Sequence, residues 1–239
     1  MKTNLITLLI AIFALVGSAT AQKKIQVYKD GAVAYSEYVS DIDSVKFIEL
    51  NNGHEYVDLG LSVKWATCNV GATAPEEYGD YFAWGETSPK SDYAWSNYKF
   101  GWQNSLEKYT TLSSYGGFSV DYKTILELED DAAHVNWGGT WRMPTVTEQD
   151  ELLSKCTLTW ITQNGVNGYK VTSNINGNSI FLPAAGYCYG SALIDRESVC
   201  GYWSKSLNVA YNEAAYLLFS NTTRSYSRDH GMSVRAVCE

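Results

Sequence analysis

At the centre of the chain stands Gly138-Gly139-Thr140-Trp141-Arg142-Met143-Pro144-Thr145-Val146-Thr147-Glu148-Gln149-Asp150-Glu151-Leu152-Leu153. This order of residues predicts a glycine turn, an extended segment and then a helix. Pro144 disfavours helical backbone at Met143. Thr145, followed three residues later by Glu148, is typical of a capping box, in which two free backbone N–H groups at a helix start find partners. We therefore expect a helix that begins after Thr145 and runs for about ten residues.

A helix this short needs tertiary packing, because short isolated helices are only marginally stable in water. Leu152, Leu153 and Cys156 fall on one helical face, and this face is expected to be buried. Trp141 and Met143 arrive in the preceding extended segment and are its expected packing partners. The stretch contains no catalytic motif, so it predicts architecture rather than a ligand.

The first 21 residues have the features of a secretory signal peptide. Lys2 precedes an apolar run from Leu5 to Val16, and Ala19-Thr20-Ala21 ends the segment, which is the order that signal peptidase substrates follow. The alternative is a membrane anchor, but the run is shorter than the ~20 apolar residues that a span needs. No cysteine follows closely, which argues against a lipoprotein. We expect an exported protein, at the cell surface or extracellular, with the periplasm as a further possibility.

The charge of the chain limits its partners. The formal net charge is −8, whereas a nucleic-acid partner requires a basic surface and anionic lipid also attracts basic segments. No later stretch is long and apolar enough to span a membrane. We therefore expect neither nucleic-acid binding nor membrane insertion of the mature chain, and the sequence leaves the oligomeric state open.

The five cysteines permit disulfides in an exported protein. Cys188 with Cys200 would close a short loop, and Cys156 with Cys238 is the second expected pair, which leaves one thiol over. The alternative is that all five stay reduced. A structural zinc site is not expected, because the chain has no C-x-x-C spacing and only three histidines.

Composition shifts divide the remaining chain into two parts. Residues 22–50 contain two alternating segments around Lys29-Asp30-Gly31, which is a hairpin signal, and a further half-buried strand is expected between Ile42 and Leu50. This part is expected to be a small β module. Residues 51–239 form the main domain, which begins with strands over 56–61 and 63–66 and continues through the loop-rich region 69–118.

The main domain is predicted to be α+β. A second helix is expected from Thr124 to Val135, with Ile125, Leu128, Ala132 and Val135 on its buried face and Gly138 as its stop. Many short strands follow. A strand is expected at 156–160, turns at Asn164-Gly165 and Asn167-Gly168, and a hairpin at Asn176-Gly177 between 169–172 and 179–182. The last three strands are expected at 202–204, 214–219 and 232–237.

Several motifs occur in a fixed order over residues 55–238. They are Glu55-Tyr56-Val57-Asp58-Leu59-Gly60-Leu61-Ser62-Val63-Lys64-Trp65-Ala66, Tyr78-Gly79-Asp80-Tyr81-Phe82-Ala83-Trp84-Gly85-Glu86, Trp141-Arg142-Met143-Pro144-Thr145, Ile180-Phe181-Leu182-Pro183-Ala184-Ala185-Gly186, Tyr202-Trp203-Ser204 and Gly231-Met232-Ser233-Val234-Arg235-Ala236-Val237. This set resembles the major paralogous domain family (Fib-succ-major) of secreted bacterial proteins. The resemblance implies a C-type-lectin-like fold with two helices, small twisted antiparallel sheets and long loops at one end. It implies no activity, because fold does not determine function.

Metal and enzyme sites have little support in the sequence. The Glu-Pro-Asn signature of calcium-dependent lectins is absent, and Trp203-Ser204-Lys205 stands where those lectins have Trp-Asn-Asp. Asp130-Asp131-x-x-His134 is interpreted as acids at a helix start rather than as a metal site. No Gly-x-Ser-x-Gly motif is present, and the paired cysteines of the related sulfatase-activating enzymes have no counterpart. We expect no cofactor and no catalysis.

The best candidate for function is the C-terminal stretch 187–230. Its tyrosines, asparagines and arginines have the composition of a binding face, with rigid rings beside adaptable hydrogen-bonding groups. The candidate ligand-binding residues are Tyr187, Tyr189, Arg196, Asn208, Tyr211, Asn212, Arg224, Tyr226, Arg228 and His230. The stretch also carries Lys205 and Asp229. Trp65, Trp141 and Trp203 are expected in the core instead.

Three functions follow from these observations. The first is a surface-associated binding module that recognises a protein or glycan through the C-terminal loops without calcium. The alternative is a structural component of the cell envelope or of an appendage, because an odd cysteine and a small β module could serve assembly. An enzyme of the sulfatase-activating type is the third and rests on fold analogy alone.

Overall fold

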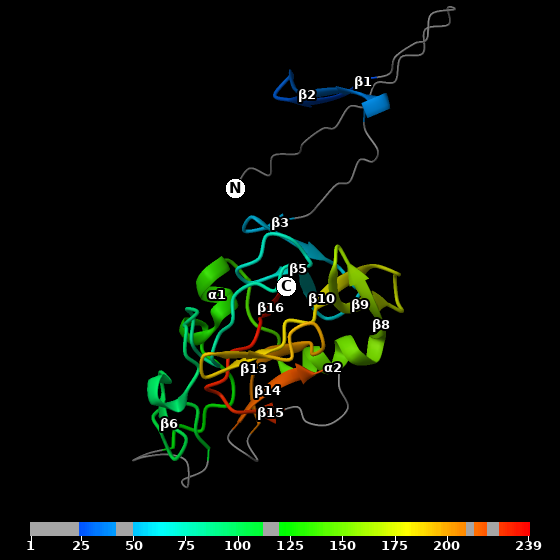
Figure 1. The fold of residues 1–239 in the computed structure, drawn as a ribbon. Coiled ribbons are helices and arrows are strands. Elements are labelled where there is room, and N and C mark those ends of the chain that lie inside the picture. Colours follow the sequence, from blue (N-terminus) through cyan, green and yellow to red (C-terminus); the bar gives the residue numbers. More distant parts are fainter. Residues whose placement is uncertain (1–23, 42–49, 112–119, 209–212, 219–224) are drawn as a thin grey trace, which may run out of the picture. The chain divides into compact units, whose positions relative to one another are not determined.

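The computed structural model describes residues 24–41, 50–111, 120–208, 213–218 and 225–239 (Figure 1). Contacts divide the chain into two compact units, Met1–Ile48 and Glu49–Glu239. The predicted signal peptide, residues 1–21, lies outside the described residues. Within the described ranges, neither α-helix has the length and apolar character that a membrane crossing requires.

The first unit contains the predicted hairpin. Strands β1 (Lys24–Lys29) and β2 (Ala32–Tyr38) pair antiparallel with Lys29 opposite Ala32. Asp30 and Gly31 between them have φ angles of 52° and 81°, which is the left-handed backbone that a two-residue hairpin turn requires. A short 3-10 helix, η1 (Val39–Asp41), follows. Of the strand expected between Ile42 and Leu50, residues 42–49 lie outside the described residues.

The second unit begins with a four-stranded antiparallel sheet in the order β16-β5-β4-β3. Its strands are β3 (Leu50–Asn51), β4 (His54–Val57), β5 (Lys64–Asn69) and β16 (Arg235–Cys238). The sheet places the end of the chain beside the start of the unit. Arg235 is buried, and its guanidinium donates to Asn69 Oδ1 and to the carbonyls of Ala66 and Thr67 at 2.8–3.1 Å. These bonds fix β16 to β5.

A three-stranded antiparallel sheet, in the order β10-β9-β8, follows the helix α2 (Val146–Lys155). Its strands are β8 (Cys156–Gln163), β9 (Val166–Ser173) and β10 (Ser179–Pro183). The turn at Asn164-Gly165 and the hairpin around Asn176-Gly177 are confirmed. The turn expected at Asn167-Gly168 is wrong, because both residues lie inside β9. Gly168 is needed for close approach, since a Cβ there would stand 2.3 Å from the carbonyl oxygen of Leu182.

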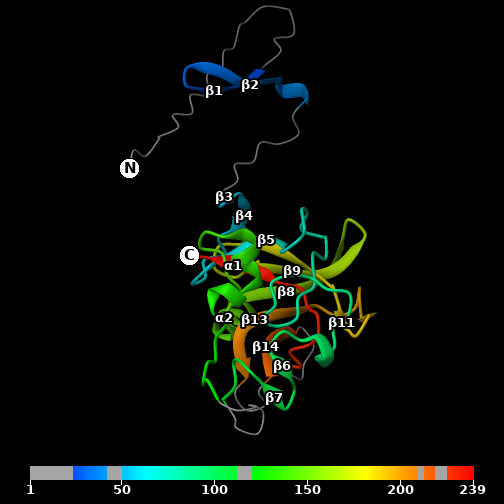
Figure 2. The same ribbon diagram turned by 90° about the vertical axis from the view of Figure 1, so that its left-hand side faces the viewer.

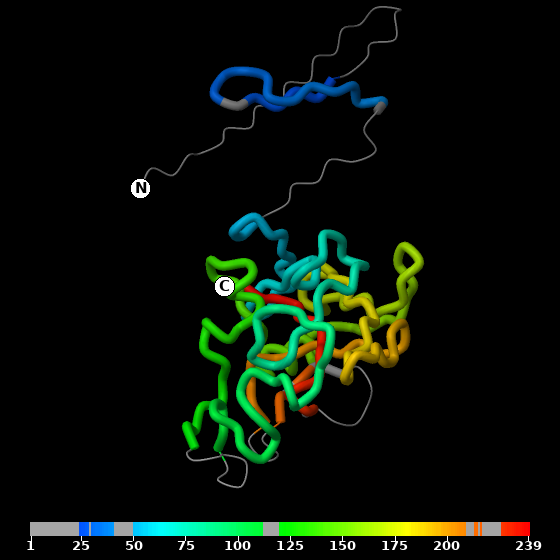
Figure 3. The backbone as a smooth tube through the Cα atoms, turned by 60° about the vertical axis from the view of Figure 1, so that its left-hand side comes forward, coloured from blue at the N-terminus to red at the C-terminus, as the bar shows by residue number. Residues whose placement is uncertain are grey.

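Three smaller sheets complete the unit. One has three strands in the order β13-β14-β15, namely β13 (Gly201–Asn208), β14 (Glu213–Leu218) and β15 (Ser225–Tyr226). The other two are pairs: β11 (Tyr187–Tyr189) with β12 (Ala192–Ile194), and β6 (Gly101–Trp102) with β7 (Ser105–Leu106). Between β5 and the 3-10 helix η2 (Trp95–Asn97) the chain runs as loops, which Figure 3 traces. The loop region predicted from the aromatic and glycine residues is therefore present.

The predicted helix from Thr124 to Val135 is shorter and starts later than expected. A 3-10 helix, η3 (Leu128–Asp130), precedes α1 (Ala132–Trp137), because the Asp131 side chain caps α1 and restarts the backbone there. The predicted buried face is wrong for three of its four residues, and Ala132 is buried as expected. Ile125, Leu128 and Val135 are 43%, 50% and 50% exposed. The buried residues of α1 are Ala132, Ala133 and Trp137, and Gly138 ends the helix at φ 66° as predicted.

Helix α2 (Val146–Lys155) has the predicted capping box. Glu148 N–H donates to Thr145 Oγ1 at 3.2 Å, and Thr145 N–H donates to Glu148 Oε2 at 2.7 Å. Leu152 and Cys156 are buried as expected, in a cluster with Val171 and Leu182. Trp141 and Met143 are buried in the other cluster, so they are not the packing partners that the sequence suggested. Helix α2 packs on β13 and β14 instead.

Two hydrophobic clusters make up the core of the second unit. The larger contains Trp84, Trp141 and Trp203, and the smaller contains Trp65. Trp65, Trp141 and Trp203 are at most 1% exposed, which confirms their predicted place in the core. Figure 2 shows α1 and α2 beside several small antiparallel sheets. The predicted α+β class is confirmed at this level, with two α-helices in the described residues.

Thr145→Ala is expected to lower the free energy of unfolding by about 1 kcal/mol, because it removes the side chain that caps α2. Thr147→Ala is the matched control, since Thr147 is exposed in the first turn of the same helix and should change stability by less than about 0.5 kcal/mol. Urea unfolding measures both variants. Equal losses in the two variants would contradict a specific role for the cap.

Acid should remove the contribution of the Glu148 charge to the free energy of unfolding. Burial alone would raise the pKa of this carboxyl, but hydrogen bonds from Arg142 and Thr145 hold the pKa below its usual value. Glu148→Gln keeps a capping side chain and loses the charge pair with Arg142, whose N–O distance is 2.6 Å. A lowered pKa stabilises the folded state above the unfolded pKa of about 4.3. The stability difference between wild type and Glu148→Gln should therefore be full at neutral pH and vanish in acid, as urea titrations across pH would show.

Candidate functional site

Three of the predicted ligand-binding residues pack around the imidazole ring of a fourth, His230. The His230 ring stacks on Tyr189 with centroids 4.8 Å apart and planes 13° apart, and it meets the edge of Tyr226 at 4.7 Å. Tyr187 lies 5.9 Å from His230 and 5.4 Å from Tyr226. We call Tyr187, Tyr189, Tyr226 and His230 the aromatic cluster. Such edge and offset-stacked pairs add to the stability that burial gives.

Backbone pairing brings the cluster together. Cys188 and Gly231 exchange hydrogen bonds at 2.7 and 3.0 Å, and Tyr93 and Gly190 exchange two at 2.8 Å. Gly231 packs directly on Tyr93, because a Cβ at this glycine would stand 2.6 Å from the tyrosine ring. In Figure 2 the β11 strand that carries Tyr187 and Tyr189 lies at the right-hand edge of the second unit. A glycine after His230 therefore lets the final loop lie against β11.

The His230 side chain is held by the residues before it. Its Nδ1 lies 3.2 Å from Asp229 Oδ1, and the Ser227 hydroxyl donates to the same oxygen. A carboxylate only accepts hydrogen bonds, so Nδ1 is the donor in this contact. Ser227 bonds to the aspartate rather than to the histidine, so this trio lacks the nucleophile–base contact of a hydrolase. The arrangement orients the ring.

The exposed members of the predicted site lie around β11 and β12. Tyr189 is 59% exposed, while Tyr187 and Tyr226 are half-buried. Arg196 is exposed, and its guanidinium lies over the Tyr78 ring at 4.8 Å. Asn208 is half-buried at the end of β13, opposite Glu213. Tyr211, Asn212 and Arg224 lie outside the described residues.

Parts of the stretch 187–230 are buried, although the sequence predicted a binding face there. Arg228 is fully buried, with its guanidinium 5.1 Å from the Trp84 ring and donating to the carbonyls of Lys108 and Tyr109. Burial lowers the pKa of Arg228. His230, Lys205 and Asp229 are also buried. Arg228 and Lys205 therefore belong to the core, because long side chains reach inward to carbonyls and to Asp131 rather than outward to a ligand.

Sequence reasoning missed the two aspartates that border the aromatic cluster. Asp92 precedes Tyr93, and its Oδ1 lies 3.7 Å from where a Cβ on Gly190 would stand. Asp195, at the end of β12, is close enough to help raise the pKa of Tyr226, although burial is the larger cause. Burial also raises the pKa of Tyr93 to about 12. The only sequence signal for Asp92 was its place in an aromatic loop without periodicity, so it could not be assigned to β11.

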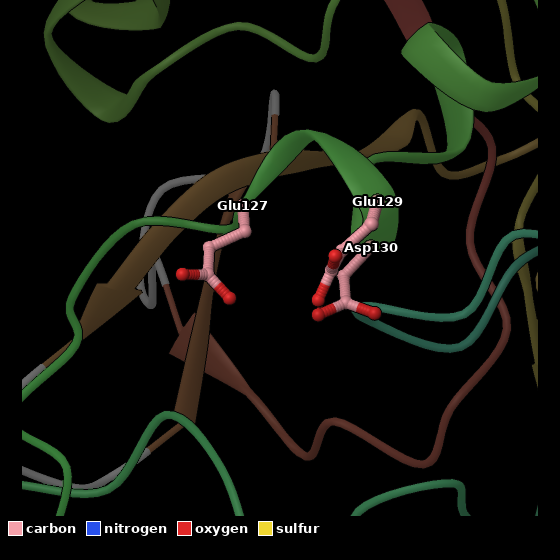
Figure 4. A group of neighbouring side chains, drawn as sticks. All are labelled: Glu127, Glu129 and Asp130. Atoms are coloured by element: carbon pink, nitrogen blue, oxygen red, sulfur yellow. The ribbon is translucent and has the colours of Figure 1, made fainter.

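A group of three carboxylates could be mistaken for a metal centre. Oxygens of Glu127, Glu129 and Asp130 lie within 4.8 Å of one another (Figure 4). Lys108 Nζ sits among them, at 2.6 Å from Glu127, 3.0 Å from Glu129 and 2.6 Å from Asp130. An ammonium group therefore already fills the position that a cation would take. Lys99 adds a contact to Asp130 at 2.5 Å.

Asp131 and His134 have structural partners. Asp131 Oδ1 accepts from the backbone N–H groups of Ala133 and His134, and both of its oxygens accept from Met143 N–H at 3.0 Å. His134 Nδ1 lies 3.1 Å from the Trp141 carbonyl. The interpretation of Asp131 as an acid at a helix start is confirmed.

All five cysteines are free thiols in the structure, and neither predicted pair is formed. Cys188 packs against the larger hydrophobic cluster and Cys200 belongs to the smaller one. Cys156 lies in the smaller cluster and Cys238 in the larger one. The members of each predicted pair therefore stand on opposite sides of the division between the clusters. Burial raises the pKa of Cys188 to about 11 and of Cys200 to about 12, so their thiols are protonated at neutral pH.

Comparison with known proteins identifies no relative: no protein-family model, no curated protein and no solved structure matches this chain.

Lys108→Met is expected to lower the free energy of unfolding by about 1–2 kcal/mol, because Asp130, whose side chain is 3% exposed, loses a charged partner. Lys123→Met is the control. Among the residues that the structure describes, the Lys123 ammonium contacts only the more exposed Glu127, at 2.6 Å, and exposed pairs contribute little. Urea unfolding compares the variants. Equal stability of the two variants would show that Lys108 does not hold the three carboxylates.

Proposed function

We propose that this chain is an exported, non-enzymatic binding module that recognises a protein or glycan at a cell surface through the aromatic cluster, without bound calcium. The supporting observation is the packing of Tyr187, Tyr189 and Tyr226 around His230, with Tyr189 still 59% exposed. The finer assignment to a C-type-lectin-like domain of the major paralogous family rests on the sequence motifs and belongs to the same proposal.

The geometry favours recognition because the exposed ring is already fixed. Tyr189 stacks on His230, and His230 is held by Asp229, by an edge contact with Tyr226 and by the tilted ring of Tyr187. A side chain ordered before binding loses little conformational entropy when a ligand arrives. An exposed tyrosine offers an apolar face and a hydroxyl together. This combination suits the flat apolar faces and hydroxyl groups of sugars as well as protein side chains.

The residues at the expected lectin position support recognition without calcium. Lys205, in the Trp203-Ser204-Lys205 segment, is buried, and its ammonium lies 3.6 Å from Asp131 Oδ2. Calcium requires several oxygen ligands facing one point, and here a lysine lies beside the Asp131 carboxylate. The function is therefore assigned to the rings at the β11 edge.

Tyr189→Ala is the test of this function. We expect it to weaken binding to any glycan or protein captured on arrays by about tenfold, as loss of a central aromatic contact does. Tyr122→Ala is the matched control, because Tyr122 is 70% exposed and has no ring contact among the described residues. Circular dichroism checks that both variants fold. Unchanged binding by Tyr189→Ala, or equal loss by both variants, would overturn the aromatic cluster as the contact surface.

A further inference from the structure

Strand β8 forms an open edge of its sheet. The order β10-β9-β8 leaves β8 paired on one side only, with β9. Figure 1 shows β10, β9 and β8 following one another toward the right-hand edge of the second unit. The N–H of Cys156, the first residue of β8, donates to the Leu152 carbonyl at the end of α2. Within the described residues, no backbone group from Thr157 to Gln163 bonds to a segment other than β9. Open edges present unpaired N–H and C=O groups to any strand of suitable shape.

The register identifies which groups face outward. Ser173 N–H donates to the Asn178 carbonyl and Ala184 N–H donates to the Asn167 carbonyl, so odd-numbered residues of β9 bond toward β10. Even-numbered residues of β9 must then bond toward β8, because the two directions alternate along a strand. Their partners on β8 are Thr157, Thr159, Ile161 and Gln163. The N–H and C=O groups of Leu158, Trp160 and Thr162 therefore point away from the sheet.

This edge lacks the usual protection. Exposed edges generally carry lysine, proline or a bulge that prevents pairing, but β8 reads Cys-Thr-Leu-Thr-Trp-Ile-Thr-Gln and pairs with β9 without a register shift. It has neither charge nor proline, although the whole chain has a net charge of −8. Two β8 strands that meet therefore bring no like charges of their own into contact.

A two-fold axis through Trp160 would make the edge complementary to itself. Antiparallel pairing places Trp160 opposite Trp160 of the second copy and Leu158 opposite Thr162, so that all three outward-facing residues of each strand exchange hydrogen bonds. Trp160 is 43% exposed, and facing aromatic pairs stabilise antiparallel strands. The same residues would serve both copies, as in an isologous dimer.

The charged residues near the two ends of β8 are compatible with the register that pairs Trp160 with Trp160 of the second copy. Lys155, just before the strand, is exposed, and no contact of its side chain is found among the described residues. At the other end Asn164 donates to Glu76 Oε1 at 2.6 Å. Antiparallel pairing brings Lys155 of one copy toward the Glu76 end of the other, so opposite charges meet at both ends of the shared strand pair.

We propose that the β8 edge pairs with β8 of a second copy of this chain, joining the two three-stranded sheets into one across a two-fold axis. This interface is separate from the aromatic cluster, so the dimer and the ligand-binding function can fail independently.

Sedimentation velocity of the full chain over a range of concentrations tests the proposal. We expect wild type to reach twice the monomer mass. Trp160→Lys should raise the dissociation constant by about tenfold or more, because two lysines then meet at the axis. Ile175→Lys is the matched control, since Ile175 is 58% exposed but lies in the β9–β10 loop, and this variant should dimerise like wild type. Wild type that stays monomeric at every concentration would overturn the proposal.

A second pair of variants guards against misfolding at Trp160. Thr162→Pro removes an outward N–H that the fold does not use, whereas Thr162→Ala loses the same hydroxyl contact to Asn167 and keeps the N–H. Only the proline variant should dissociate. Hydrogen exchange then locates the interface, because the amides of Leu158, Trp160 and Thr162 should become protected as the dimer forms. A dimer in which these amides exchange freely, or one that Thr162→Pro leaves intact, contradicts pairing through β8.

Discussion

The buried carboxylate of Asp131 holds together segments that are far apart in the sequence. It caps α1 through Ala133 and His134, binds the Met143 N–H with both oxygens, and faces the Lys205 ammonium at 3.6 Å. Burial raises the pKa of Asp131 against these bonds, and a buried acid is tolerated only when such partners satisfy it. The backbone of Lys205 adds bonds to Pro144 and Leu126 at 2.8 and 2.9 Å. The start of α1, the Trp141–Pro144 segment and β13 are thus fixed to one another.

Hydrogen bonds from two indole N–H groups connect β13 to the loop region. Trp84 Nε1 donates to the Ser204 carbonyl, and Trp203 Nε1 donates to the Phe82 carbonyl at 2.7 Å. These bonds hold the loop region 69–92 although it has almost no regular structure. Phe82 pairs in turn with Met232, whose neighbour Gly231 pairs with Cys188 in β11. The aromatic cluster therefore stands at the end of a continuous path of buried hydrogen bonds, which explains how residues on loops and short strands can present an ordered ring.

Local signals predicted much of the secondary structure. The capping box at Thr145, the turns at Asp30-Gly31 and Asn164-Gly165 and the stop at Gly138 all depend on backbone conformations that adjacent residues dictate. The predictions of turns and helices failed where the same local pattern is compatible with more than one structure. Gly168 is a turn residue by composition but stands in a strand because Leu182 approaches it closely. The period at Ile125, Leu128 and Val135 favoured a longer helix, but the Asp131 cap interrupts that backbone and leaves those side chains exposed.

By itself, the sequence determined the α+β class, the main hairpins, the buried tryptophans and the stretch in which to look for a binding face, because composition and short-range spacing carry that information. Only the tertiary structure decided which members of that stretch share a site. Tyr187, Tyr189, Tyr226 and His230 meet because β11 and the final loop pair across Gly231, while Arg228 and Lys205 turn inward to carbonyls and to Asp131. The open edge of β8 was equally hidden from sequence, since a strand's pattern of side chains does not state which neighbour its backbone lacks.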